Sequence, residues 1–171
     1  MAAHNEIWAK AAAIVRDAGG RIVGRTKLQK VGYLLELCGL GDGFQFEYRH
    51  YGPYSEDLAE AIKIAGAFGL VEEEERKADW GGFYSIYSST EQARHQSSAR
   101  VQLAKAAAQI GAVELELAAT AAYLSAVERS ADPWGETKKL KPEKATPSRL
   151  NAAKTAYRDL RKICPKSLPN I

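Results

Sequence analysis

The sequence predicts a mainly α-helical fold with a small β-sheet. A winged-helix-like module over residues 1–90 is followed by a helical extension over residues 91–171, which packs on it as one compact unit. Three observations predict this class: apolar residues recur at helical spacing in the first half, a glycine-containing turn separates two short strands, and the second half is rich in alanine. Helix, helix, strand, helix and hairpin in this order are typical of a winged helix-turn-helix domain.

The first two helices are predicted from periodicity and end signals. Apolar residues at helical spacing predict a helix over residues 5–18, and residues 21–24 are expected to form only a connector. Thr26 is expected to cap the second helix, with Gln29 completing a capping box, and Gly39 is expected to end it as a left-handed C-cap.

A strand, a helix and a hairpin follow. The alternation of aromatic and polar side chains over residues 44–50 predicts a half-buried strand. Ser55 is expected to cap a third helix that reaches residue 68. Residues 70–75 and 82–88 are predicted to pair as a hairpin.

The C-terminal part is predicted to contain two further helices. The alanine-rich stretch predicts one helix from about residue 91 to 128, with a bend at Gly111, and its surplus of small apolar side chains suggests a homodimer. A basic loop is expected next. Thr146 and Pro147 form an N-cap followed by a proline, which predicts the start of the last helix.

Composition excludes several classes of protein. A hydrophobic fraction of 46% in 171 residues can fill a core, which excludes a disordered chain. No apolar run approaches the ~20 residues of a membrane span, and the N-terminus lacks the pattern of a signal peptide. Two cysteines do not make a disulfide framework, so we expect a cytoplasmic protein without a membrane partner.

The sequence shows no catalytic, cofactor or metal motif. Gly39, Gly41 and Gly43 lack the spacing of a nucleotide-binding loop. The three histidines have no cysteine or carboxylate at ligand spacing on an obvious shared face. We therefore expect a protein that is not an enzyme and has no cofactor.

The charge is distributed unevenly. The formal net charge is +3, but residues 138–171 contain ten basic residues against two acidic ones, a balance of +8, and the remainder has a balance of −5. The third helix, which reads DNA in many winged-helix proteins, has Glu56, Asp57 and Glu60 against Lys63, so we expect it to contact protein rather than DNA. The candidate nucleic-acid contacts are the basic residues Arg25, Lys27, Lys30, Lys138, Lys139, Lys141, Lys154, Arg158, Arg161 and Lys162. The alternatives for these residues are a solvated charged face, or a surface that docks an acidic protein or the acidic body of a second copy.

Two segments carry a family resemblance. Residues 24–35, with the letters KLQK, and residues 46–58, with the letters YGP, resemble the YwgA-like family of uncharacterised bacterial and phage-associated proteins. More distantly they resemble the SocA/Panacea antitoxin domain. The resemblance covers about residues 22–90. It implies a scaffold that includes Leu28, Tyr33, Tyr51, Gly52 and Pro53, and for the antitoxin-like members an action through protein contact.

Two functional hypotheses follow. The first is a non-enzymatic regulatory module that binds another protein, antitoxin-like or adaptor-like, with a toxin or a regulatory target as partner. The second is a DNA-binding transcriptional regulator that combines a winged-helix scaffold with the basic C-terminal segment.

Overall fold

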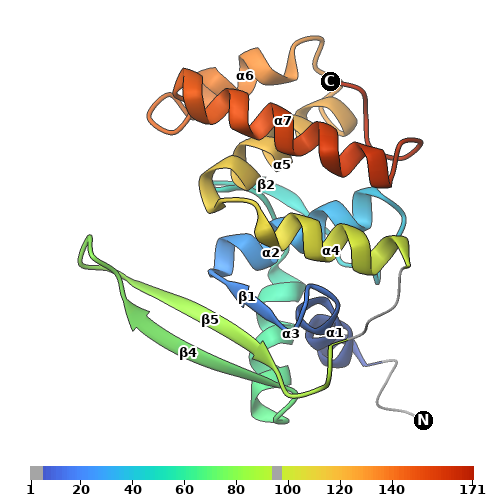
Figure 1. Ribbon diagram of the computed structural model, residues 1–171, viewed down its shortest axis with the longest axis vertical. Coiled ribbons are helices and arrows are strands. Elements are labelled where there is room, and N and C mark those ends of the chain that lie inside the picture. Colours follow the sequence, from blue (N-terminus) through green and yellow to red (C-terminus); the bar gives the residue numbers. More distant parts are fainter. Residues whose placement is uncertain (1–5, 94–97) are drawn as a thin grey trace.

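The computed structural model describes residues 6–93 and 98–171 and shows a mainly helical protein with a small antiparallel sheet (Figure 1). The elements in chain order are α1 (Ile7–Asp17), β1 (Arg21–Val23), α2 (Arg25–Leu37), β2 (Glu47–Arg49), β3 (Gly52–Tyr54), α3 (Glu56–Ala67), β4 (Val71–Lys77), β5 (Phe83–Ser89), α4 (Ala99–Gln109), α5 (Ala112–Ala126), α6 (Pro133–Leu140) and α7 (Pro147–Ile163). The mainly helical class with a small sheet is confirmed.

The larger sheet has the strand order β1-β5-β4, and both strand pairs are antiparallel. The predicted hairpin is confirmed as β4 and β5, which extend away from the helical body (Figure 1). The prediction of a connector at residues 21–24 is wrong, because this segment forms β1, which pairs with β5 from Arg21–Ser88 to Val23–Ile86. Burial of Ile22 fixes this short strand in place.

The predicted strand over residues 44–50 is shorter in the structure. Only Glu47–Arg49 is a strand, and it pairs with Gly52–Tyr54, which the sequence suggested was a break. The residues before it form a loop because the Glu36 carboxylate accepts hydrogen bonds from three backbone N–H groups, those of residues 42–44, at 2.8–2.9 Å.

Helix ends were predicted well where the signal is local. The Ser55 hydroxyl accepts a hydrogen bond from the Leu58 N–H, as an N-cap does. Gly39 has a φ of 68°, as expected of a left-handed C-cap. The capping box is wrong, because α2 begins one residue before Thr26 and has Gly24 as its N-cap.

The helical extension differs from its prediction in two respects. The single helix expected over residues 91–128 is two helices, α4 and α5, separated near the predicted bend at Gly111, and residues 94–97 of that range lie outside the described residues. The predicted basic loop contains α6, which begins because the Asp132 side chain accepts from the Gly135 N–H and Pro133 occupies the first turn. The start of α7 is confirmed, since the Thr146 side chain accepts from the Arg149 N–H.

The core is organised around α5. Residues 115–124 of this helix are all buried, and it packs against α2, α6, α7 and β3. One hydrophobic core therefore contains side chains from both halves of the chain. The small apolar side chains of α5 on which the homodimer prediction was based lie in this core, and the homodimer stays a prediction. Among the described residues, no helix is long and apolar enough to cross a membrane.

Candidate functional site

The polar residues of the KLQK segment bind backbone groups inside the protein. Gln29 and Ser55 form a buried pair in which the Gln29 amide donates to the Ser55 carbonyl at 3.0 Å and accepts from the Ser55 N–H at 2.8 Å. The Lys30 Nζ donates to the Pro53 carbonyl at 2.7 Å, and the Lys27 Nζ donates to the Ala108 carbonyl at 3.1 Å. These side chains hold the YGP turn and the end of α4 against α2.

A buried ionic cluster lies beneath the YGP turn. The Glu116 carboxylate, on α5, is 2.8 Å from the Lys141 Nζ and 2.8 Å from the Lys144 Nζ. Lys141 also donates to the His50 carbonyl. Burial lowers the pKa of Lys30 to about 7; the Glu116 charge opposes this shift, whereas the positive charges of Lys141 and Lys144 add to it. The cluster therefore contains three lysines and one carboxylate.

The scaffold residues implied by the resemblance surround this cluster. Gly52 has a φ of 85°, and a Cβ at this position would lie 2.6 Å from the Thr120 Oγ1, so the close approach of β3 to α5 requires glycine. Leu28 and Tyr33 are buried, and the Tyr33 ring packs against that of Phe46. Tyr51 is exposed, with the Lys144 Nζ 4.6 Å from its ring centroid.

A groove of about 740 Å³, which we call the hairpin groove, lies beside the sheet. It lies between β5, α3 and the start of α2, and its walls include residues from the YGP turn. Three of its aromatic side chains are largely exposed: Trp80 at 77%, Phe83 at 63% and Tyr51 at 58%. Large aromatic side chains clustered at one hollow are typical of a recognition surface.

The charges in the hairpin groove are only partly balanced. The Arg25 guanidinium is 3.2 Å from the Glu73 carboxylate and donates to the Ser85 hydroxyl. Lys27 and Lys30 also line the groove, and both donate to backbone carbonyls rather than to carboxylates. Burial lowers the pKa of Lys27 as well, and the charge of Glu114 opposes this shift.

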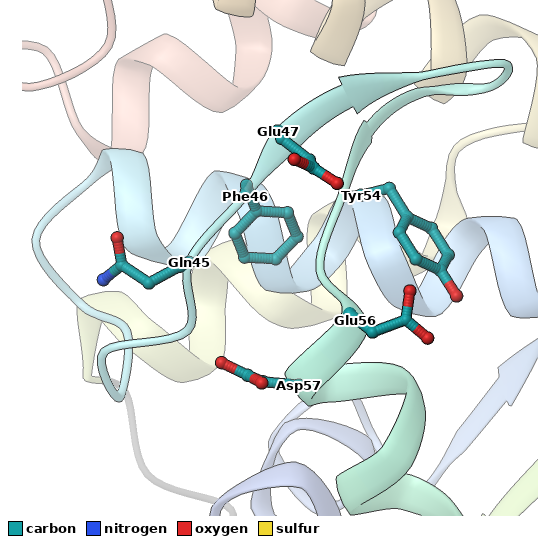
Figure 2. Close-up of a pocket in the computed structure, with 6 residues that line it drawn as sticks. All are labelled: Gln45, Phe46, Glu47, Tyr54, Glu56 and Asp57. Atoms are coloured by element: carbon teal, nitrogen blue, oxygen red, sulfur yellow. The ribbon is translucent and has the colours of Figure 1, made fainter.

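A second, smaller hollow of about 290 Å³ lies between β2, β3 and the start of α3 (Figure 2). Glu47, Glu56 and Asp57 are placed around the Phe46 ring. The Arg49 guanidinium pairs with both Glu47 and Glu56, the latter at 2.9 Å, so two of the three carboxylates are already compensated.

The predicted protein contacts on α3 lie at its surface. Glu56, Asp57, Glu60 and Lys63 are all exposed, and Lys63 pairs with Glu60 at 3.0 Å. Of these residues, Glu56 and Lys63 also line the hairpin groove.

The structure separates the predicted nucleic-acid contacts into two groups. Lys30 and Lys141 are buried, which corrects the expectation of a surface position for both. Lys138, Lys139, Arg158 and Lys162 are exposed on α6 and α7, Arg25 is exposed at the start of α2, and Lys27, Lys154 and Arg161 are partly buried. The exposed charge is further reduced because Lys162 pairs with Asp159 at 2.7 Å.

Sequence reasoning missed the residues that shape both sites. Trp80 and Phe83 belong to a hairpin that the sequence predicted. They line the same groove as the start of α2 because β1, which directly precedes α2, pairs with β5, and this pairing was not predicted. Glu116 was also overlooked. Its position in a helix of leucines and alanines was the available signal, because a carboxylate in such a helix is buried only when it is paired. The sequence analysis did not predict that the two cysteines lie together. Cys38 and Cys164 are both buried, and burial together with a hydrogen bond between them raises the pKa of Cys38.

Within residues 6–93 and 98–171, no group of three or more histidine, cysteine or carboxylate side chains is placed to hold a metal ion.

Comparison with known proteins gives one partial match. No family model matches the chain. A segment of 73 residues is 36% identical to the uncharacterized protein YwgA of Bacillus subtilis (strain 168). The match covers 42% of this chain and 43% of that protein, so less than half of either is compared. The similarity to a YwgA-like protein is thereby supported for that segment, and the antitoxin resemblance has no counterpart in the comparison.

Proposed function

We propose that the protein is a non-catalytic regulatory module that binds another protein in the hairpin groove. The observation that carries this proposal is the exposure of Trp80, Phe83 and Tyr51 around one hollow. Trp80 lies in the turn between β4 and β5 and Phe83 is the first residue of β5, so their exposed side chains contribute nothing to the core. The hairpin of β4 and β5 extends from the body (Figure 1). Exposed aromatic side chains cost solubility, and binding of a partner offsets that cost.

A winged-helix relationship fits this proposal. Apart from β2 and β3, which lie between α2 and α3, the order α1, β1, α2, α3, β4 and β5 with the sheet order β1-β5-β4 is the arrangement expected of such a domain. In that relationship the hairpin is the wing, and α3 is the helix that would enter DNA. The start of α3 is acidic, so a role in protein contact is favoured over reading of bases. An antitoxin-like or an adaptor-like role is compatible with this geometry.

Site-specific photo-crosslinking tests the proposal. A photoreactive phenylalanine analogue replaces Trp80 in the full chain, and cells of the source organism are irradiated. We expect a covalent adduct with a discrete protein, and no such adduct when the analogue replaces Val127, which is 53% exposed at the end of α5. The proposal is overturned if both positions give the same adducts or if Trp80 gives none.

The second candidate function, nucleic-acid binding, is favoured by the exposed basic residues of α6 and α7. A gel-shift titration at low salt tests it. If this surface binds DNA, reversing the charge of Lys138, Lys139, Arg158 and Lys162 to glutamate abolishes the shift, and the affinity of the unaltered protein falls steeply as salt is added. Substitution is the appropriate test because truncation at residue 138 would remove buried residues of α7 from the core.

A further inference from the structure

We infer that the partner enters the hairpin groove as an extended strand and pairs with the free edge of β5. This inference rests on the proposed function and specifies how the groove is occupied. An added strand obtains affinity from main-chain hydrogen bonds and specificity from pockets for its side chains.

The edge of β5 is free where the groove begins. Pairing of β1 with β5 ends at Val23 and Ile86, followed by one hydrogen bond from the Gly24 N–H to the Ser85 carbonyl at 2.8 Å. Gly24 has a φ of 101° and directs the chain into α2. In the described part of the chain, Phe83 and Tyr84 therefore have a strand partner only on the β4 side.

The backbone of Phe83 points toward the groove. The Ser85 carbonyl faces the β1 side, and the backbone groups of alternate residues in a strand face the same side. The N–H and carbonyl of Phe83 therefore also face the β1 side, where β1 has ended. These groups are the main-chain donor and acceptor that an added strand would use.

The lining of the groove agrees with an opening at the sheet edge. Side chains alternate between the two faces of a strand, so Phe83 and Ser85 lie on one face and Tyr84 lies on the other. All three line the hairpin groove. A hollow on one face of the sheet would be lined by alternate residues only, whereas a hollow at the edge is reached from both faces.

The groove also specifies the chemistry of the strand. Trp80 and Phe83 present apolar surface, which fits aliphatic or aromatic side chains. Lys27 lines the α2 side, is only partly buried and donates to the Ala108 carbonyl rather than to a carboxylate, which fits an acidic side chain. The expected occupant is therefore an extended peptide segment of another protein that contains both apolar and acidic residues. A nucleic acid is disfavoured because it has a phosphate at every nucleotide and some would meet Glu56 and Glu73, whereas a peptide can place its acidic residue at Lys27.

A peptide selection with backbone-methylated variants tests the inference. Linear twelve-residue peptides displayed on phage are selected on the full chain and counter-selected on Ala59→Trp, which fills the groove from α3. Each selected peptide is then synthesised with a single N-methyl group at successive positions, and its affinity is measured by fluorescence polarisation. We expect one position to lose about tenfold in affinity, because on this edge of β5 the Phe83 carbonyl is the acceptor that β1 leaves free for an added strand.

A change in β5 gives the complementary measurement. Phe83→Pro removes the N–H that faces the groove but no hydrogen bond to β4, so we expect an unchanged thermal midpoint and an affinity about tenfold weaker. Phe83→Ala is the matched control, since it removes the ring and keeps the N–H. Hydrogen exchange at the Phe83 amide is expected to slow on binding in the unaltered protein.

The outcomes separate this inference from the proposed function. Methylation that is tolerated at every position, or that follows a helical period, overturns strand pairing while leaving a peptide-binding groove. Failure to select any groove-dependent peptide also overturns strand pairing, and the crosslink from Trp80 then decides alone whether a protein binds there. A dimer mass in light scattering that returns to the monomer mass in Ala59→Trp would indicate a second copy in the groove and would overturn the inference of a different partner protein.

Discussion

Raising the pH from 7 to 9 is expected to stabilise the folded protein, because Lys30 is buried among other charges. The pKa of Lys30 is lowered from 10.5 to about 7, first by burial and then by Lys141 and Lys144, against the opposing charge of Glu116. Between these two pKa values the unfolded chain binds one proton that the folded chain releases. The cost of burying the charged amine is therefore complete below pH 7 and decreases as the pH rises toward 10.5.

The magnitude follows from the two pKa values. Integrating the proton difference from pH 7 to pH 9 gives an increase of about 2 kcal/mol in the free energy of unfolding from this one group. For a chain of this size that corresponds to about 4–8 °C in the thermal midpoint. Urea unfolding at several pH values between 7 and 9 measures the effect directly.

Substitution of the lysine isolates its contribution. Lys30→Met retains a similar volume without an ionisable group. Between pH 7 and pH 9 we therefore expect its free energy of unfolding to increase by about 2 kcal/mol less than that of the unaltered protein. Lys63→Met is the matched control, because Lys63 is exposed on α3, and it should keep the pH dependence of the unaltered protein. Parallel stability curves for the unaltered protein and Lys30→Met, both unfolding cooperatively, would refute this account of Lys30.

Two further predictions concern the same buried region. Glu116→Gln leaves buried lysines without their carboxylate and is expected to lower the free energy of unfolding by about 3–5 kcal/mol. Glu60→Gln, which removes a carboxylate from an exposed pair, is the control and should lower it by less than about 1 kcal/mol. Urea unfolding measures both differences. Gly52→Ala is expected to destabilise the protein because the new Cβ meets the Thr120 Oγ1 at 2.6 Å, and Thr120→Ala in the same chain should restore part of the loss. If the two substitutions are simply additive in thermal unfolding, the close approach of β3 to α5 is not the cause.

Local signals predicted the elements whose formation depends on nearby residues. Ser55 and the Thr146-Pro147 pair were identified as helix starts because a cap bonds to an N–H only three residues away. The strand at residues 21–23 was missed because three residues are too few for a periodic pattern, and its pairing with β5 is long-range. The start of α6 was visible as Asp132 followed by a proline, but the lysines after it suggested a loop.

The candidate sites were harder to predict than the fold. A lysine in an amphipathic helix is normally solvated, so Lys30 and Lys141 were counted with the surface basic residues. Their burial depends on Glu116 and on the carbonyls of the YGP turn, which lie far from them along the chain. The hairpin groove could not be predicted from the sequence either. It is formed where β1 ends beside β5, and β1 itself was not predicted.

The buried cluster also determines how late the chain can finish folding while it is being synthesised at the ribosome. Lys30 emerges early, but α5, which supplies Glu116, and α6, whose end precedes Lys141, emerge much later. A nascent chain that has reached only the hairpin lacks α5, and therefore lacks both the Glu116 carboxylate that interacts with Lys30 and the Thr120 side chain on which Gly52 packs. The N-terminal module therefore reaches its final packing only after α5 has left the exit tunnel, and cotranslational folding of this protein ends late.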